Sequence, residues 1–271
     1  GDLPQEHARQ LTLIWEEATP CFRTHPSELE LTAGVELTLR RPPTPLYAIP
    51  DVIFAFDGLR CLEVSCHPVA ALPAAVGRMK SLKRLVLVSL YLQEIPDEVC
   101  DLPYLEQILA CCCNIQRIPA RMHTCAKMWR LFLDGNMLRE LPDPMPGQLE
   151  GLKLSGNRLE VLPDSIGDCW RTHDILAYGN ALTRIPDSVG RLENLRHLML
   201  HGNRLVSLPE SVGQIRGLET LLVHDNFLEA VPEAVADLQR LEWLYVYNNR
   251  LRELPRGLTR RGPSLRRRPA G

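Results

Sequence analysis

The sequence predicts an α/β solenoid, with short parallel strands on one side and short helical or irregular segments on the other. The first observation behind this prediction is a recurring proline that follows Leu, Ile or Val. The step between these prolines is 23 residues at every interval except one of 21; they are Pro50, Pro73, Pro96, Pro119, Pro142, Pro163, Pro186, Pro209, Pro232 and Pro255. A unit of this length cannot bury its apolar side chains alone, so neighbouring units must stack and share one core.

The second observation is the apolar pattern inside each unit. The stretch Leu195–Leu205 reads L-x-x-L-x-L-x-x-N-x-L, and the following unit repeats it. The alternation around Leu198 and Leu200 predicts a short strand with one buried face, and the residues between them point to the concave side. This is the pattern of a leucine-rich repeat. We therefore expect a curved horseshoe with a parallel sheet on its concave side.

An asparagine follows each predicted strand in most units. It stands at Asn136, Asn157, Asn180, Asn203, Asn226 and Asn249. We expect its side chain to turn inward and satisfy backbone groups where the chain bends, because a buried unpaired backbone group costs about 1–3 kcal/mol. Cys113 takes this position in one unit, and His67 and Leu90 take it in the first full units.

A short helical or irregular return on the convex side follows each proline. Apolar residues stand three and six positions after it, as Val189 and Leu192 do after Pro186. Pro186 provides a fixed φ for the start of this return, and Asp187 and Ser188 provide capping groups.

Two units depart from the pattern. Thr172 stands where later units have a leucine, and we expect Trp170 to fill the space. The 21-residue unit between Pro142 and Pro163 shortens the convex segment.

Three segments organise the chain. Residues 1–34 are expected to hold a capping helix and a linker; docking to a neighbouring domain is the alternative role of that helix. Residues 35–260 form the repeat domain of nine to ten units, which begins with a degenerate strand at 35–39. Residues 261–271 continue an arginine-rich stretch without acids, for which we expect a disordered basic tail.

Composition limits the partners and the compartment. The formal net charge is −2 over 271 residues, so nothing attracts nucleic acid or an anionic membrane globally. No apolar run is long enough for a membrane span. The nine cysteines are odd in number and partly inside the repeats, unlike the terminal disulfide clusters of extracellular repeat proteins. We expect a reducing compartment, the cytoplasm.

The predicted concave face carries the candidate partner site. Side chains that the core does not require gather there, and aromatic residues and Met are enriched where proteins meet. The candidates are Tyr178, His197, Met199, His201, His224, Trp243, Tyr245 and Tyr247, together with Arg130 and Phe132. Arg130 and Phe132 belong to a second, apolar stretch that competes with the C-terminal patch as a docking site for a helix or an extended peptide.

Two other interpretations of these residues stay open. The aromatic side chains stack along a column and only stabilise the sheet, or His201 and His224 share a metal. Two imidazoles make a poor zinc site, so no metal and no cofactor are expected. Tyr178 separates Ser155 from His201, so no catalytic residues are assigned.

The repeats resemble those of intracellular leucine-rich repeat proteins typified by Ras-group scaffolds, and the same repeat occurs in bacterial effectors delivered into host cells. The resemblance covers about residues 46–258. It implies a non-enzymatic interaction module in intracellular signalling, monomeric, with a protein partner on the concave face and without nucleic acid. The alternative is a substrate-recognition part of a larger enzyme or of a secreted effector, such as a ubiquitin ligase, kinase or GTPase, which would act in the host cytosol. A third interpretation makes the basic tail a nucleic-acid arm.

Overall fold

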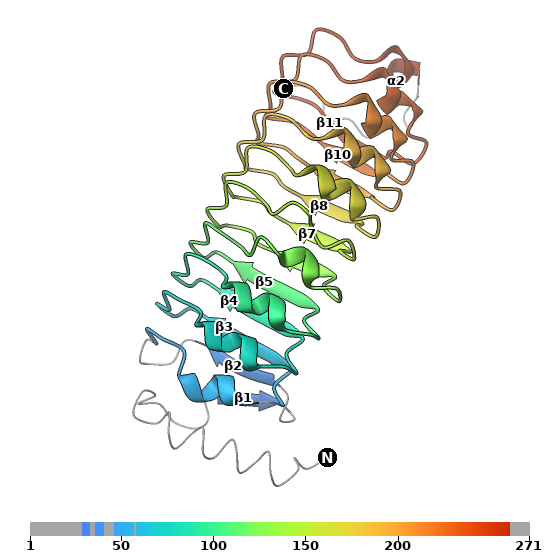
Figure 1. Ribbon diagram of the computed structural model, residues 1–271. Helices are drawn as coiled ribbons and strands as arrows, with labels where there is room; N and C mark the ends of the chain where they lie inside the picture. The colour runs from blue at the N-terminus through green and yellow to red at the C-terminus, as the bar shows by residue number, and fades with distance from the viewer. Residues whose placement is uncertain (1–28, 33–35, 41–45, 57, 261–271) are drawn as a thin grey trace. The chain divides into compact units, whose positions relative to one another are not determined.

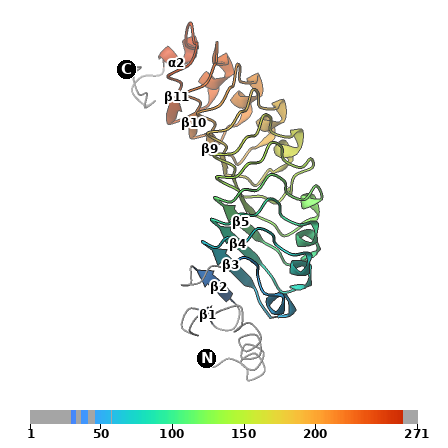
Figure 2. The same cartoon turned by 90° about the vertical axis from the view of Figure 1, so that its left-hand side faces the viewer.

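The computed structural model describes residues 29–32, 36–40, 46–56 and 58–260. The chain forms two compact units, unit 1 (Gly1–Asn136) and unit 2 (Met137–Gly271). In each unit the strands line one side and the short helices line the other (Figures 1 and 2). The expected N-terminal helix and the expected C-terminal tail lie outside the described residues.

The described residues of unit 1 contain six strands in sequence order. Five of them pair in parallel with their neighbours: β2 (Glu36–Arg40), β3 (Cys61–Ser65), β4 (Arg84–Val88), β5 (Gln107–Cys111) and β6 (Arg130–Phe132). The degenerate first strand expected near residue 37 is therefore present as β2. The remaining strand, β1 (Leu29–Thr32), pairs antiparallel with β2, and the sequence analysis did not predict it.

Five parallel strands lie in the part of unit 2 that the structure describes. They are β7 (Gly151–Lys153), β8 (Asp174–Leu176), β9 (His197–Met199), β10 (Thr220–Leu222) and β11 (Trp243–Tyr245). The register advances by one repeat per strand, so that Asp174 pairs with His197 and Thr220 pairs with Trp243. Side chains at equal repeat positions therefore lie side by side on neighbouring strands, about 4.8 Å apart.

A short 3-10 helix follows nearly every repeat proline. In unit 1 these helices are η2 (Asp51–Ala55), η3 (Ala74–Arg78), η4 (Asp97–Asp101) and η5 (Met122–Thr124). In unit 2 they are η6 (Asp164–Asp168), η7 (Asp187–Arg191), η8 (Glu210–Gln214) and η9 (Glu233–Asp237), followed by the helix α2 (Arg256–Arg260). The shortened return between Pro142 and Pro163 has no helix before η6 within its described residues.

The repeat proline itself occupies the N-cap of every one of these 3-10 helices except η5, whose N-cap is Arg121. Pro186 has φ −73° and ψ 153° at the start of η7, which confirms its expected role in fixing the backbone. No side chain caps this helix, so the prediction that Asp187 and Ser188 supply capping groups is wrong. In η7 the proline starts the turn by its conformation alone.

The core lies between the sheet and the 3-10 helices. Its side chains come from the predicted leucine positions, and Leu198, Leu200, Leu221 and Val223 have no exposed surface. The side chains between them, such as Met199, stay partly exposed on the face of the sheet that is turned away from the helices. We call this face the open face; it corresponds to the concave side of the prediction.

The prediction that Trp170 fills a gap in the core is wrong. Trp170 is 49% exposed, and the guanidinium of Arg171 lies 4.8 Å from its ring centroid. Thr172 instead takes the core position itself, fully buried, and its hydroxyl donates a 2.8 Å hydrogen bond to the carbonyl of Leu149. Because this bond satisfies the hydroxyl, the core tolerates a polar residue there.

The asparagines form the predicted ladder of inward hydrogen bonds. Asn203 Nδ2 donates to the carbonyls of Ala177 and Leu200 at 2.9 and 2.8 Å, and Oδ1 accepts from the Leu182 N–H at 3.0 Å. Each asparagine thus links its own turn to the preceding repeat. The carboxamide oxygen accepts an equivalent backbone hydrogen bond at Asn136, Asn157, Asn180, Asn226 and Asn249.

Two substitutes keep part of this ladder in unit 1. His67 Nδ1 accepts from the Leu46 N–H at 3.3 Å, the same span of 21 residues that Asn136 covers. Cys113 Sγ donates to the carbonyls of Leu87 and Cys111. Burial raises the pKa of the Cys113 thiol to about 11, so it stays protonated and keeps its donor at neutral pH.

Candidate functional site

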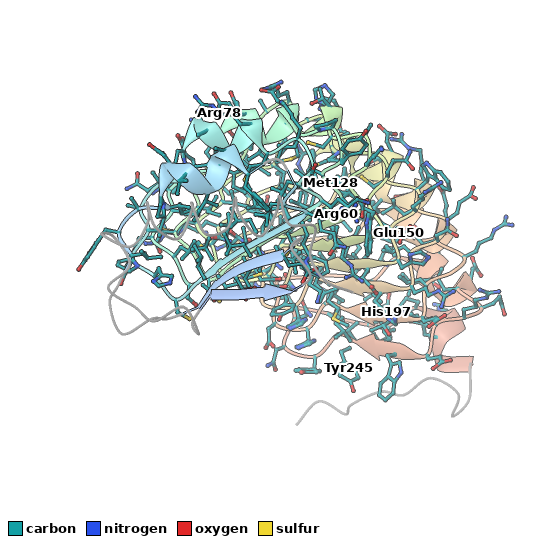
Figure 3. The ribbon with its side chains drawn as sticks, turned by 90° about the horizontal axis from the view of Figure 1, so that it is seen from below. Arg60, Arg78, Met128, Glu150, His197 and Tyr245 are labelled. Carbon is teal, nitrogen blue, oxygen red and sulfur yellow. The ribbon has the colours of Figure 1, made fainter. Side chains whose placement is uncertain are left out.

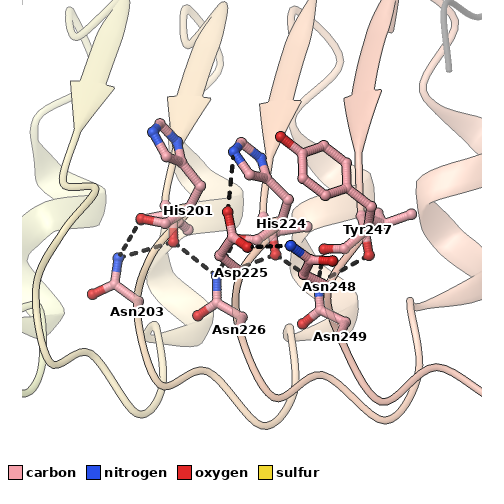
Figure 4. A network of polar contacts seen from close by, with 11 residues as sticks. His201, Asn203, His224, Asp225, Asn226, Tyr247, Asn248 and Asn249 are labelled. Carbon is pink, nitrogen blue, oxygen red and sulfur yellow. Dashed lines mark hydrogen bonds and ion pairs between the residues drawn. The ribbon is translucent and has the colours of Figure 1, made fainter. Parts of the chain in front are cut away.

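Four rings stack in one row on the open face of unit 2. Tyr178, His201, His224 and Tyr247 occupy the same position in successive repeats, and we call this row the aromatic ladder. Its successive ring centroids lie 4.6, 4.5 and 4.4 Å apart, with interplanar angles of 9°, 7° and 25°. Figure 4 shows three of these rings, His201, His224 and Tyr247, above the asparagines that hold each turn.

Two further aromatic side chains lie beside the ladder on β11. Tyr245 meets His224 edge-on, with centroids 5.9 Å apart, and is tilted against Tyr247 at 6.0 Å. Trp243 meets Tyr245 edge-on at 6.2 Å. Figure 3 shows Tyr245 projecting from the side of the sheet opposite the helices. The rings of β11 therefore form one continuous aromatic surface with the ladder.

The remaining predicted residues of unit 2 lie on β9. Met199 and His197 are both partly exposed, and Met199 stands between Leu176 and Leu222 in the strand register. His197 Nε2 lies 3.9 Å from a carboxylate oxygen of Asp174 on β8. All eight candidates of unit 2 thus belong to one stretch of the open face.

Arg130 and Phe132 lie in unit 1, on β6. The Arg130 guanidinium lies over the Trp129 ring at 4.3 Å and at 5.7 Å from the centroid of Phe132. Phe132 stands in register with the partly exposed Leu109 on β5 and Val86 on β4, so these three side chains form an apolar row of unit 1.

Burial controls the charge of the ladder histidines. It lowers the pKa of both His201 and His224, and for His201 the neighbouring His224 lowers it further. Asp225 opposes the shift, because His224 Nε2 lies 3.7 Å from one of its carboxylate oxygens. The stacked imidazoles are consequently neutral at pH 7, which allows them to lie face to face without repulsion.

Asp225 and Asn248 are site residues that the sequence analysis missed. Each stands directly before the asparagine that closes its turn. Asp225 has φ 54° and Asn248 has φ 50°, in the left-handed region where the four repeats before Asp225 have glycine. Asn248 Nδ2 donates a 2.7 Å hydrogen bond to Asp225 Oδ1 (Figure 4). The signal was the change from glycine to Asp and Asn at this position, because these two side chains tolerate the left-handed conformation better than most.

Neither a metal cluster nor a membrane helix emerges from the described residues. No three His, Cys, Asp or Glu side chains are grouped there so as to hold a metal ion. None of the helices in that part of the chain is long and apolar enough to cross a membrane.

Similarity to known proteins agrees with this geometry. The Leucine Rich Repeat family model matches residues 148–169 and 194–215. No curated protein matches the chain. The chain is similar to the ectodomain of the Arabidopsis thaliana membrane receptor kinase GASSHO1/SCHENGEN3, with 28% identity and a TM-score of 0.73 over 80% of this chain and 27% of that one. That ectodomain was solved in complex with CASPARIAN STRIP INTEGRITY FACTOR 2.

Two bacterial structures share the fold at lower identity. A leucine-rich repeat protein of Leptospira interrogans has 22% identity and a TM-score of 0.65, covering 83% of this chain and 64% of that one. The leucine-rich repeat domain of the type III effector XopL has 20% identity and a TM-score of 0.59, covering 97% and 81%. This chain spans less than two thirds of the plant ectodomain and of the Leptospira protein. Because both segments matched by the family model have the strand, asparagine and 3-10 geometry described above, the chain is a leucine-rich repeat protein.

Proposed function

We propose that the chain is a non-enzymatic protein-interaction module, and that the open face of unit 2 binds a protein partner. This proposal rests mainly on the continuous surface that the aromatic ladder forms with Trp243 and Tyr245. Their side chains stand at repeat positions that lie outside the core. Aromatic and Met side chains bury large areas at modest entropic cost, and they dominate the energetics of many interfaces. Repeat folds of this kind generally act as binding scaffolds rather than as enzymes.

Stacking alone is the competing explanation for these rings. A cross-strand aromatic pair stabilises a sheet by about 0.2–1 kcal/mol, so the ladder contributes to stability in either case. Tyr178 nevertheless keeps 38% of its surface exposed, and most of the other rings stay partly exposed. This remaining area is available to a partner.

An intracellular signalling role fits the cysteines. The eight cysteines in the described part of the chain are all free. Free thiols at this density are typical of a reducing compartment such as the cytoplasm. A secreted effector that acts in the host cytosol has the same property, and the similarity to the XopL repeat domain favours this second candidate. In that case the chain would be the recognition part of a longer protein.

Affinity capture from a reducing cell lysate tests the binding face. The bait is the full chain, compared with Trp243→Ala/Tyr245→Ala and with Trp170→Ala as the matched control. Trp170 is an exposed tryptophan outside the sheet. We expect the double variant to lose a protein that the other two baits retain, with affinity reduced about thirtyfold or more, as for a hot spot of about 2 kcal/mol. Titration calorimetry with the identified protein measures the change.

Circular dichroism separates loss of binding from loss of fold. The double variant should keep the spectrum of the unmodified chain, since both side chains lie outside the core. Equal retention of the captured protein by all three baits would show that the partner does not use this face. It would move the search to the apolar surface around Phe132 in unit 1.

A further inference from the structure

We propose that the open face of unit 2 recognises an arginine-bearing segment of its partner, with the guanidinium stacked on Tyr247 beside Asp225. This inference rests on the proposed function and names the chemistry of the partner. It follows from how the carboxylates and the rings of this face are arranged.

The Asp225 carboxylate has no basic partner among the described lysines and arginines. Its Oδ1 accepts from the Asn248 amide, and its Oδ2 lies 3.7 Å from the neutral His224 imidazole. No lysine or arginine of the described ranges lies within ion-pair distance of it. The side chain is 48% exposed, directly beside the stacked rings (Figure 4). A cation from a partner can therefore reach it.

Three further carboxylates border the same face. Asp174 lies 3.9 Å from the His197 imidazole, its one ion-pair partner within the described ranges. Glu219 and Glu242 precede β10 and β11, and neither forms an ion pair among the residues described. Arg196 in their row and Lys153 on β7 are basic, but the four carboxylates outnumber them, so this face of unit 2 stays acidic overall. This charge favours a basic segment over an acidic or purely apolar one.

Some acids elsewhere in the chain are paired with a basic residue of a neighbouring repeat. Asp168 pairs with Arg191 at 2.8 Å, and Glu106 pairs with Lys83 at 2.7 Å. These pairs join neighbouring repeats on other parts of the surface. On the open face of unit 2, by contrast, Asp174 and Asp225 form no ion pair with a described lysine or arginine.

The rings supply the second half of an arginine site. Tyr247 stacks on His224 with one face, and no described ring stacks on its other face. A guanidinium is planar, stacks on aromatic faces and binds carboxylates with two parallel hydrogen bonds, whereas an ammonium does not combine these contacts. The chain itself places Arg250 4.6 Å from the centroid of the exposed Phe227 ring.

Peptide binding to the full chain tests the inference. The probe is a fluorescein-labelled peptide of five arginines alternating with glycine, and its control replaces each arginine by citrulline, which has the same shape without the charge. Fluorescence anisotropy at pH 7.5 in 50 and 300 mM NaCl measures binding. We expect the arginine peptide to bind more tightly than the citrulline peptide by about fivefold or more, and salt to weaken it.

A pair of charge variants localises the site. Asp225→Asn removes the carboxylate beside the ladder, and Asp237→Asn removes an exposed carboxylate of η9 with the same change in net charge. We expect the first to weaken arginine-peptide binding by about threefold to fivefold and the second to leave it unchanged. Equal binding of the two peptides, or equal effects of the two variants, would overturn the inference.

The outcome is separable from that of the proposed function. A captured protein that is lost with Trp243→Ala/Tyr245→Ala but is insensitive to Asp225→Asn and to salt would overturn the arginine site and leave the binding face standing. If the aromatic double variant instead retained every captured protein, both the binding face and the arginine site would be overturned.

Discussion

Single buried side chains close the hydrogen bonds of each repeat, and Asn203 illustrates how much depends on one residue. Its carboxamide serves the Leu182 N–H and two backbone carbonyls, all of them inside the protein. Water cannot replace these bonds without opening the turn. His67 performs only the acceptor part of this task, through Nδ1.

The first residue-scale prediction follows from this role. Asn203→Ala should lower the free energy of unfolding by about 3 kcal/mol, because it leaves buried backbone groups unsatisfied. Asn194→Ala is the control, since Asn194 makes one exposed hydrogen bond to the Trp170 carbonyl and should change stability by only about 0.5 kcal/mol. Urea denaturation measures both. If both variants lost a similar free energy of unfolding, Asn203 would contribute no more to stability than an exposed asparagine does.

The second residue-scale prediction concerns mild acid. Burial lowers the pKa of His201 and His224 in the folded chain, so the unfolded chain binds protons more readily. Their contribution to stability is complete above about pH 6.5 and is lost as the pH falls from there towards the lower folded pKa values. The melting temperature should therefore fall less between pH 7.5 and 5.5 in His201→Gln/His224→Gln than in the unmodified chain.

His123→Gln is the control for the acid prediction, because His123 is exposed. Some acid sensitivity should remain in the double variant, since burial also lowers the pKa of His67. The explanation fails if the ladder variant loses as much stability in acid as the chain with both histidines.

Successive 3-10 helices pack so closely that they limit the size of the side chains between them. A Cβ atom added at Gly213 in η8 would lie 2.4 Å from the Cβ of Ala234 in η9. Neither atom is at the end of a flexible side chain, so the backbone would have to move. The helical side of unit 2 therefore needs glycine at this position, although its φ is ordinary.

A matched pair of glycine substitutions tests the spacing of these helices. Gly213→Ala should destabilise the chain by about 1–3 kcal/mol through overpacking. At Gly147 the nearest atom to an added Cβ is 3.6 Å away, so Gly147→Ala should be neutral or stabilising by about 0.4–1 kcal/mol. Chemical denaturation of the two variants gives the comparison. Equal effects would mean that the helices can separate without cost.

For the molecule as a whole, the solenoid class, the strands and the asparagine hydrogen bonds could be predicted from the sequence, because the same residue types recur about every 23 residues. It failed where a residue satisfied the core in an unexpected way, as Thr172 does through the Leu149 carbonyl. It also missed β1, which lies outside the repeat pattern. The aromatic side chains of the site were predictable from their position, but the Asp225–Asn248 contact depends on backbone conformation and was not.

The one short repeat shows where the chain can change its length. The asparagine bond spans 21 residues at Asn180, Asn203, Asn226 and Asn249, but only 19 from Asn157 back to Leu138. Two residues have thus been removed between its ends while the bond stays closed at 3.0 Å. The return segment between Leu138 and Asn157 can therefore change its length without breaking this bond. The turn that Asn157 closes after β7 is thereby insulated from such changes.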